Sequence, residues 1–140
     1  MVKQVAIPTV VKPKNTVYSD FLNDLTPHPI VKDIVKYTNE NAVSKAIRNL
    51  LLTDRGERLY QPDIGSDIRK LLFEPMNGAI SELISTYVNN TINTYEPRAK
   101  VLDVKAVPDY DNNLYTVFIT YMIINKQEPI TLNISLRRVR

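Results

Sequence analysis

Tyr95-Glu96-Pro97-Arg98 divides the chain into a helical part and a part made of β-strands. Residues 39–95 carry apolar side chains at the three- and four-residue spacing of helices, whereas residues 99–140 show the patterns of strands. Pro97 has no backbone N–H and disfavours the helical conformation at Glu96, so the long helix before it must end here. The side chains of Glu96 and Arg98 lie two residues apart in an extended segment and therefore point to the same side.

The first helix is predicted to begin near Thr38, Asn39 or Asn41, each of which can accept a hydrogen bond from a free N–H at a helix start. It should end at Gly56, which can take the left-handed conformation that closes a helix. The side chains expected on its buried face recur at helical spacing and are Val43, Ala46, Ile47, Leu50 and Leu51.

Two further helices are predicted before Pro97. Ser66 can cap a short one, which Pro75 ends. The longest runs from about residue 77 to residue 95 and should pack across the sheet formed by the rest of the chain. Its expected apolar stripe continues for more than four turns and consists of Ile80, Leu83, Ile84, Tyr87, Val88, Thr91, Ile92 and Tyr95.

Three strands are predicted after Pro97, so the fold class is α+β, with helices packed on a small, mostly antiparallel sheet and a C-terminal β-meander. In the first strand, Leu102, Val104 and Ala106 should share one face. The second, residues 114–124, is apolar on both faces, which is typical of a central strand covered on both sides. The third alternates strictly, with Ile130, Leu132, Ile134 and Leu136 on one face and Thr131, Asn133, Ser135 and Arg137 on the other.

The last strand is predicted to have an open edge, because no later element covers it. Its unpaired backbone N–H and C=O groups then form a template to which another protein can add a strand. The alternative is that the N-terminal segment of the same chain pairs there.

Length and composition indicate one domain, residues 21–140, preceded by an N-terminal arm, residues 1–20. The chain has 140 residues, of which 44% are hydrophobic, enough for a sizeable core. Residues 1–14 contain two prolines and no clean period, which favours an arm lying on something else; an edge strand over residues 4–11 is the alternative. Phe21 and Leu22 could anchor the chain at the start of the domain.

Composition also argues against several classes of function. The absence of cysteine excludes disulfides and thiolate metal or redox sites. No stretch approaches the roughly 20 apolar residues that span a bilayer, so we expect a soluble protein with no membrane partner. Residues 41–98 hold seven basic and seven acidic residues, so the net charge of +3 is not the basic stripe that nucleic-acid binding needs.

Candidate catalytic groups are few. His28, between two prolines, is most simply a loop residue, and neither a metal site nor a cofactor site is predicted. Two carboxylates drawn from Glu57, Glu74 and Glu96 could serve glycoside hydrolysis. However, arginines within two residues of Glu57 and Glu96 would lower a carboxyl pKa, the wrong direction for a general acid. We therefore expect these residues to form structural salt bridges.

A series of motifs runs through the chain in the order residues 41–53, Gly56-Glu57-Arg58, Pro62 with Gly65-Ser66, Leu72-Phe73-Glu74, and Glu96-Pro97-Arg98 before the meander. This series resembles the baseplate wedge proteins of contractile phage tails, a family shared with type VI secretion baseplates and often labelled lysozyme-like. The resemblance covers roughly residues 21–136. Val31-Lys32-Asp33 lacks the glycine expected before the aspartate, and residues 1–14 are additional to the family core.

The resemblance implies a structural subunit without enzyme activity or cofactor that sits in the virion tail baseplate, is assembled in the host bacterial cytoplasm and initiates the contractile sheath. Its implied partners are baseplate wedge proteins and tail sheath subunits. The triplet Glu96, Pro97 and Arg98 would face the helical core bundle of neighbouring wedge proteins. The strand from Ile130 to Arg137 would pair with strands of the first sheath ring.

Two alternatives stay open at this point. Glu96 could instead pair with Arg58 or Arg98 inside the monomer, which would make the triplet an internal brace. The alternative function is a peptidoglycan-degrading glycoside hydrolase, that is, a tail lysozyme.

Overall fold

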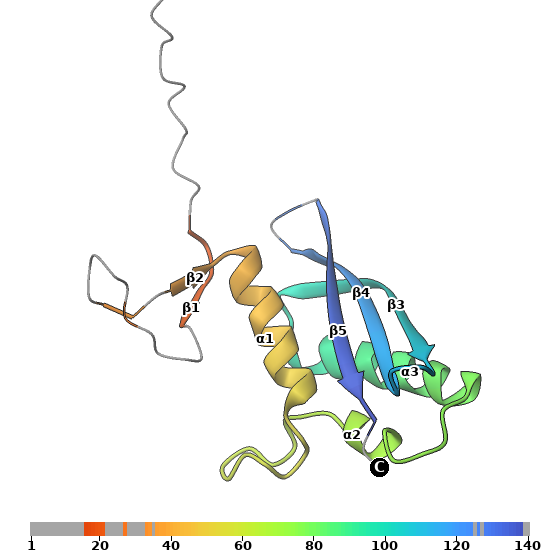
Figure 1. Cartoon of the computed structure of the whole chain (residues 1–140). Helices are drawn as coiled ribbons and strands as arrows, with labels where there is room; N and C mark the ends of the chain where they lie inside the picture. Colours follow the sequence, from red (N-terminus) through yellow and green to blue (C-terminus); the bar gives the residue numbers. More distant parts are fainter. Residues whose placement is uncertain are drawn as a thin grey trace, which may run out of the picture.

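Short strands, helices and long strands follow one another along the described part of the chain (Figure 1). The structure is a computed structural model that describes residues 16–21, 27, 33–34, 36–124, 126 and 128–138. The elements are β1 (Ser19–Phe21), β2 (Lys36–Thr38), α1 (Glu40–Leu52), α2 (Ile68–Leu71), α3 (Gly78–Tyr95), β3 (Ala99–Asp109), β4 (Leu114–Ile123) and β5 (Pro129–Arg137). β3, β4 and β5 form an antiparallel sheet in chain order, which confirms the α+β class and the meander.

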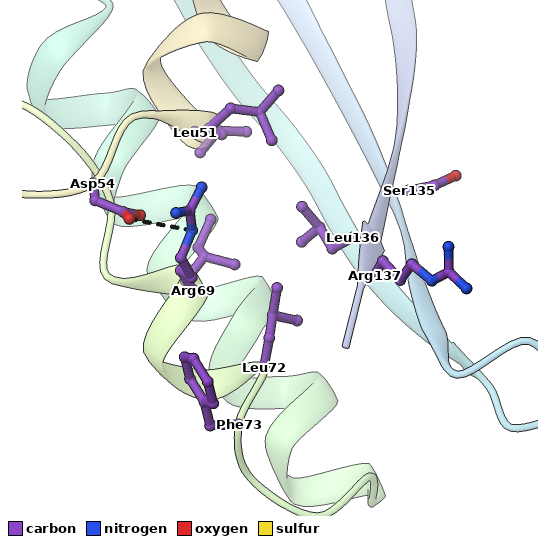
Figure 2. Close-up of a pocket in the computed structure, with 10 residues that line it drawn as sticks. Leu51, Asp54, Arg69, Leu72, Phe73, Ser135, Leu136 and Arg137 are labelled. Carbon is purple, nitrogen blue, oxygen red and sulfur yellow. Dashed lines mark ion pairs between the residues drawn. The ribbon is translucent and has the colours of Figure 1, made fainter. Parts of the chain in front are cut away.

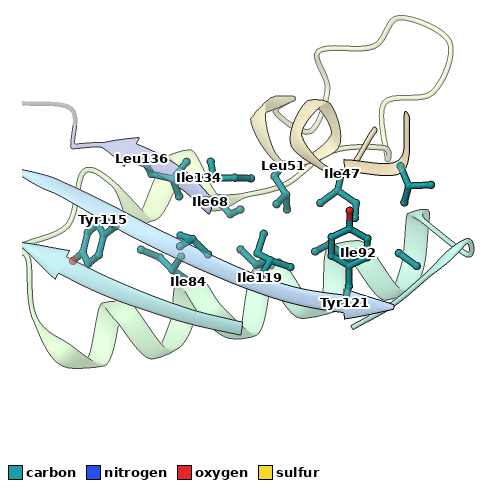
Figure 3. Packing of buried hydrophobic residues seen from close by; sticks show 14 of the residues in the cluster. Ile47, Leu51, Ile68, Ile84, Ile92, Tyr115, Ile119, Tyr121, Ile134 and Leu136 are labelled. Carbon is teal, nitrogen blue, oxygen red and sulfur yellow. The ribbon is translucent and has the colours of Figure 1, made fainter. Parts of the chain in front are cut away.

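The hydrophobic core lies between one face of the β3–β4–β5 sheet and the helices (Figure 3). Burial of each large apolar side chain contributes about 1.5–3 kcal/mol. The hydroxyl of buried Tyr121 on β4 lies 2.6 Å from that of Ser44 on α1, so this polar group has a partner inside the core. The side chains labelled in Figure 3 are Ile47 and Leu51 from α1, Ile68 from α2, Ile84 and Ile92 from α3, Tyr115, Ile119 and Tyr121 from β4, and Ile134 and Leu136 from β5.

None of the described elements covers the outer face of β4, and its residues are partly exposed, so the prediction of a strand buried on both sides is wrong. The face that contains Tyr115 and Tyr121 is fully buried, but Phe118 on the other face is 38% exposed. The helices pack on a single face of the sheet, which leaves the apolar residues of the other face partly in solvent. The strict alternation predicted for β5 is confirmed, with Ile134 and Leu136 buried and their neighbours exposed.

A β-bulge in β3 changes which residues face the core. Val101 pairs with Tyr121 and Asp103 with Thr120, so Leu102 is an extra residue between two consecutive pairs. Leu102 is 49% exposed, and the prediction that it shares a face with Val104 and Ala106 is therefore wrong. The residues of β3 that face the helices are Ala99, Val101, Val104 and Ala106.

On each predicted helical face, the central apolar residues are buried as expected, but some residues at the sides of the face are not. In α3, Ile84 and Val88 are fully buried, but Leu83 and Tyr87 are 44% and 40% exposed because they lie to one side of the face that meets the sheet. In α1, Ala42 is fully buried in place of the predicted Ala46.

The segment between α1 and α2 closes against the end of α1. Ser66 is buried, and its hydroxyl donates to the carbonyl oxygen of Leu51 (2.6 Å) while its N–H donates to that of Thr53 (2.9 Å). Ser66 therefore caps the C-terminus of α1 and does not cap α2 as predicted. Gly56 has a φ of 87°, but it lies beyond the helix end and its N–H donates to Pro62, so it does not close α1.

The N-terminal segment is fixed to the start of α1 through Tyr18. β1 pairs with β2, and Tyr18 packs against the core, whereas Phe21 is 54% exposed and does not anchor the chain as expected. Leu22, the other expected anchor, lies outside the described residues. The predicted arm, residues 1–20, is described only from residue 16 onward. His28 and the alternative strand over residues 4–11 lie outside the described residues.

We predict that Gly65→Ala destabilises the protein much more than Gly56→Ala. A Cβ at Gly65 would lie 2.8 Å from backbone atoms of Thr53 and Asp54, and its φ of 150° is one that other residues rarely adopt. Strain and clash together should cost at least about 2 kcal/mol. Gly56 has open space around its Cβ position, so only the left-handed conformation opposes alanine, at roughly 1–2 kcal/mol. Urea unfolding measures the loss of stability caused by each substitution. Equal losses would contradict the close approach of Gly65 to the backbone of Thr53 and Asp54.

Candidate functional site

The corner formed by Glu96, Pro97 and Arg98 joins α3 to β3. The N–H of Glu96 donates to Ile92 and completes the last turn of the helix, while the N–H of Ala99 donates back to Glu96 across the proline. Pro97 is exposed. The backbone carbonyl of Arg98 accepts the N–H of Ile124, so the corner is also fixed to the end of β4. The helix end predicted at Pro97 is confirmed.

Glu96 and Arg98 form an ion pair within the monomer. Glu96 is only 5% exposed, and its two carboxylate oxygens each accept a hydrogen bond of 2.6 Å from the Nε and Nη2 of Arg98. These hydrogen bonds raise the pKa of Arg98 above its ordinary value. Of the two internal pairings considered, the structure contains the one with Arg98. Glu96 therefore acts inside the domain, and Pro97 and the exposed part of Arg98 form its outer surface.

The same arginine is linked to the N-terminal segment. Its guanidinium carbon lies 5.6 Å from the centre of the Tyr18 ring, within the range of a cation–π interaction. Tyr18 is in turn held by Asn39, whose side-chain oxygen accepts the N–H of Val17 (2.8 Å) and whose N–H donates to Tyr18 (2.7 Å). Asn39 has a φ of 50° and a ψ of −114°, a sparsely populated backbone conformation that these hydrogen bonds hold in place. The sequence suggested Asn39 only as a helix cap and gave no signal for Tyr18.

The second candidate site, the outer edge of β5, has backbone groups that point away from the sheet. The N–H of Arg138 donates to Asn113, so residues at even positions of β5 bond to β4. The N–H and C=O groups of Thr131, Asn133, Ser135 and Arg137 must then face outward. Among the described residues no strand pairs with this edge. Residues 1–14, the alternative partner considered for it, lie outside the described residues.

The opposite edge of the sheet, on β3, is obstructed. The outward N–H of Ala106 donates to the hydroxyl of Ser85 on α3 (3.1 Å). Pro108, two residues along and on the same side, has no N–H to offer, and the bulge at Leu102 interrupts the edge further. Among the described residues, the β5 edge of this sheet is therefore open, whereas the β3 edge is obstructed.

Of the three glutamates considered for catalysis, Glu57 and Glu96 accept hydrogen bonds within the domain, and Glu74 is exposed. Glu57 accepts the N–H of Asp54 (2.9 Å), and Glu96 is bonded to Arg98 through both oxygens. Within the described residues, no group of three or more histidine, aspartate or glutamate side chains is placed to hold a metal ion. None of the described helices is both long enough and apolar enough to cross a membrane.

This small α+β chain, with its ion-paired corner and the open β5 edge found among the described residues, belongs to the family of baseplate wedge proteins, whose family model, "Baseplate wedge protein gp25", matches residues 38–128. The resemblance inferred from the sequence motifs is thus confirmed. The chain is similar to baseplate wedge protein gp25 of Enterobacteria phage T4, with 25% identity over 99 residues, which are 71% of this chain and 75% of the phage protein.

Solved structures share the fold. A candidate tail lysozyme from Geobacter sulfurreducens is 27% identical, with a TM-score of 0.71 over 76% of this chain and 96% of that one. A chain of the anti-feeding prophage baseplate is 18% identical, with a TM-score of 0.61 over 88% of this chain and 87% of that one. A chain of the type VI secretion baseplate complex is 17% identical, with a TM-score of 0.55 over 68% and 91%.

We predict that Glu96 and Arg98 are energetically coupled. Arg98→Ala should cost roughly 1–3 kcal/mol because it leaves the buried carboxylate without its partner, and solvent screening of the partly exposed arginine favours the lower part of this range. Glu96→Gln combined with Arg98→Ala should cost less than the sum of the single changes. A double-mutant cycle by urea unfolding measures the difference. Simple additivity would show that the pair contributes no mutual stabilisation.

Proposed function

We propose that this baseplate wedge protein is the subunit on which the contractile sheath starts, because a tail sheath subunit adds a strand to the open edge of β5. The observation that carries the proposal is the difference between the two edges of the sheet. The β3 edge is protected by Ser85, Pro108 and the bulge at Leu102, which are devices that proteins use against edge-to-edge pairing. The β5 edge has no comparable protection over residues 131–137 among the described residues.

Strand addition would satisfy the outward backbone groups of β5. Thr131, Asn133, Ser135 and Arg137 each offer one N–H and one C=O in the regular spacing of a strand. Backbone hydrogen bonds supply affinity in this mode of recognition, and side chains on alternating sides supply specificity. β5 is also held in place by its own pairing to β4 and by buried Ile134 and Leu136, so the template is rigid before the partner arrives.

The corner provides the second contact of the proposed role. We infer that Pro97 and the exposed part of Arg98 contact the helical core bundle of neighbouring wedge proteins, while Glu96 holds Arg98 in place from inside. The corner directly precedes β3, so wedge proteins bound there would fix the orientation of the sheet. The location that follows is the baseplate of a virion tail, with assembly in the host bacterial cytoplasm.

The role proposed here is structural and requires neither enzyme activity nor a cofactor. The alternative of peptidoglycan hydrolysis requires two carboxylates drawn from Glu57, Glu74 and Glu96. The carboxylate of Glu96 is buried and both of its oxygens are bonded to Arg98, so a glycosidic oxygen has no access to it. The contacts of the acidic residues therefore favour the structural role over the hydrolase.

We predict that Asn133→Pro leaves the fold intact and abolishes sheath initiation. The N–H of Asn133 faces outward, so proline removes no hydrogen bond of the sheet but takes away a donor and places its ring at the edge. The measurement is growth of ordered sheath from purified sheath subunit and wedge complexes, followed by sedimentation and negative-stain microscopy.

Two control variants make this result specific. Asn133→Thr keeps the backbone N–H and should start sheath growth as the natural protein does. Ile134→Pro removes an N–H that bonds to β4 and should unfold the domain. If Asn133→Pro is folded and still starts ordered sheath at the natural rate, strand addition at β5 is wrong.

A further inference from the structure

A groove lies beside the C-terminal half of β5, between its open edge and helices α1 and α2 (Figure 2). Its volume is about 370 Å³. Leu136 points into it from the sheet, whereas Ser135 and Arg137 point to the other side of the strand. Leu51 of α1 and Leu72, just after α2, form the facing wall.

The groove occupies the position that the inner face of one more strand would take. Adjacent strands lie about 4.8 Å apart, so a strand added to β5 runs over the space between β5 and the helices. Leu52 and Phe73, which line this space, are 45% and 59% exposed. The walls thus include large apolar side chains that the isolated domain leaves in solvent and that an inward-facing side chain of the added strand would cover.

The charged side chains near the groove at this end of β5 largely neutralise one another. The acidic groups near the groove are already paired, Asp54 with Arg69 (3.1 Å) and Asp67 with Lys70 (2.8 Å) and Arg55 (3.5 Å). Arg137 is exposed on the outer face of the sheet, and its side chain points away from the groove (Figure 2). A partner strand that carries a carboxylate next to Arg137 is therefore electrostatically favoured.

We propose that the strand added to β5 places a large apolar side chain in this groove and a carboxylate opposite Arg137. The inference rests on the proposed strand addition and specifies the chemistry of its partner. Side chains of a strand alternate between the two faces, so the residue opposite Leu136 faces the groove and its neighbour opposite Arg137 faces outward. The recognition signature is an apolar and an acidic residue adjacent in sequence.

The test is binding of purified sheath subunit to wedge complexes that contain the full chain. Phe73→Ser removes part of the groove wall, and Arg137→Glu reverses the charge that the carboxylate meets. Each should weaken binding roughly tenfold, and the natural chain should bind more weakly as salt is raised. Lys100→Glu and Leu102→Ser are the matched controls, because they make similar changes at exposed positions on the opposite strand of the sheet and should leave binding unchanged.

Asn133→Pro in the same assay separates this inference from the proposed function. If Asn133→Pro abolishes binding while Phe73→Ser and Arg137→Glu bind as the natural chain does, the strand is added but the groove and Arg137 do not select it, and the inference is overturned. If Asn133→Pro binds normally, strand addition at β5 and the inference fail together.

Discussion

The two edges of the three-stranded antiparallel sheet differ in how far their backbone groups are protected. The proposed strand addition depends on this difference. Helix α3 supplies the hydroxyl of Ser85 to the β3 edge, where Pro108 also removes a donor. The β5 edge keeps its outward N–H and C=O groups, and α1 and α2 stand far enough from it to leave a groove. An unpaired edge is a liability for a free protein because it promotes aggregation, and it becomes useful when assembly needs a directional starting point.

The corner at Glu96 and Arg98 connects this sheet to the rest of the domain. The ion pair fixes the turn from α3 into β3, the backbone of Arg98 is bonded to Ile124, and its guanidinium lies over Tyr18. A protein that contacts Pro97 and Arg98 would therefore touch the N-terminal segment, the helices and the sheet through neighbouring atoms. The triplet therefore braces the monomer through Glu96 and Arg98, and it leaves Pro97 and part of Arg98 at the surface for the contact that we propose.

Much of the fold could be predicted from the sequence because it follows from local rules. Pro97 ends α3, and the strict alternation of β5 assigns each of its side chains to the correct face. The predictions are wrong where a contact with another part of the chain determines the position of a residue. Nothing in a hydrophobic pattern shows that Leu102 is a bulge or that Ser66 caps α1 from a distant loop. The open edge was predicted from chain order alone, whereas the blocked edge of β3 depends on Ser85, a contact across 21 residues.

Amide hydrogen exchange along β5 tests strand addition most directly. Residues at even positions bond to β4, whereas residues at odd positions face outward, so the two sets can be followed separately. In the free protein, the amides of Leu132 and Ile134, which bond to β4, should exchange slowly, and those of Asn133 and Ser135, which face outward, should exchange fast. In a wedge complex bound to purified sheath subunit, the account predicts that Asn133 and Ser135 become protected as well. Fast exchange of these two amides in a complex that starts ordered sheath would contradict strand addition at β5.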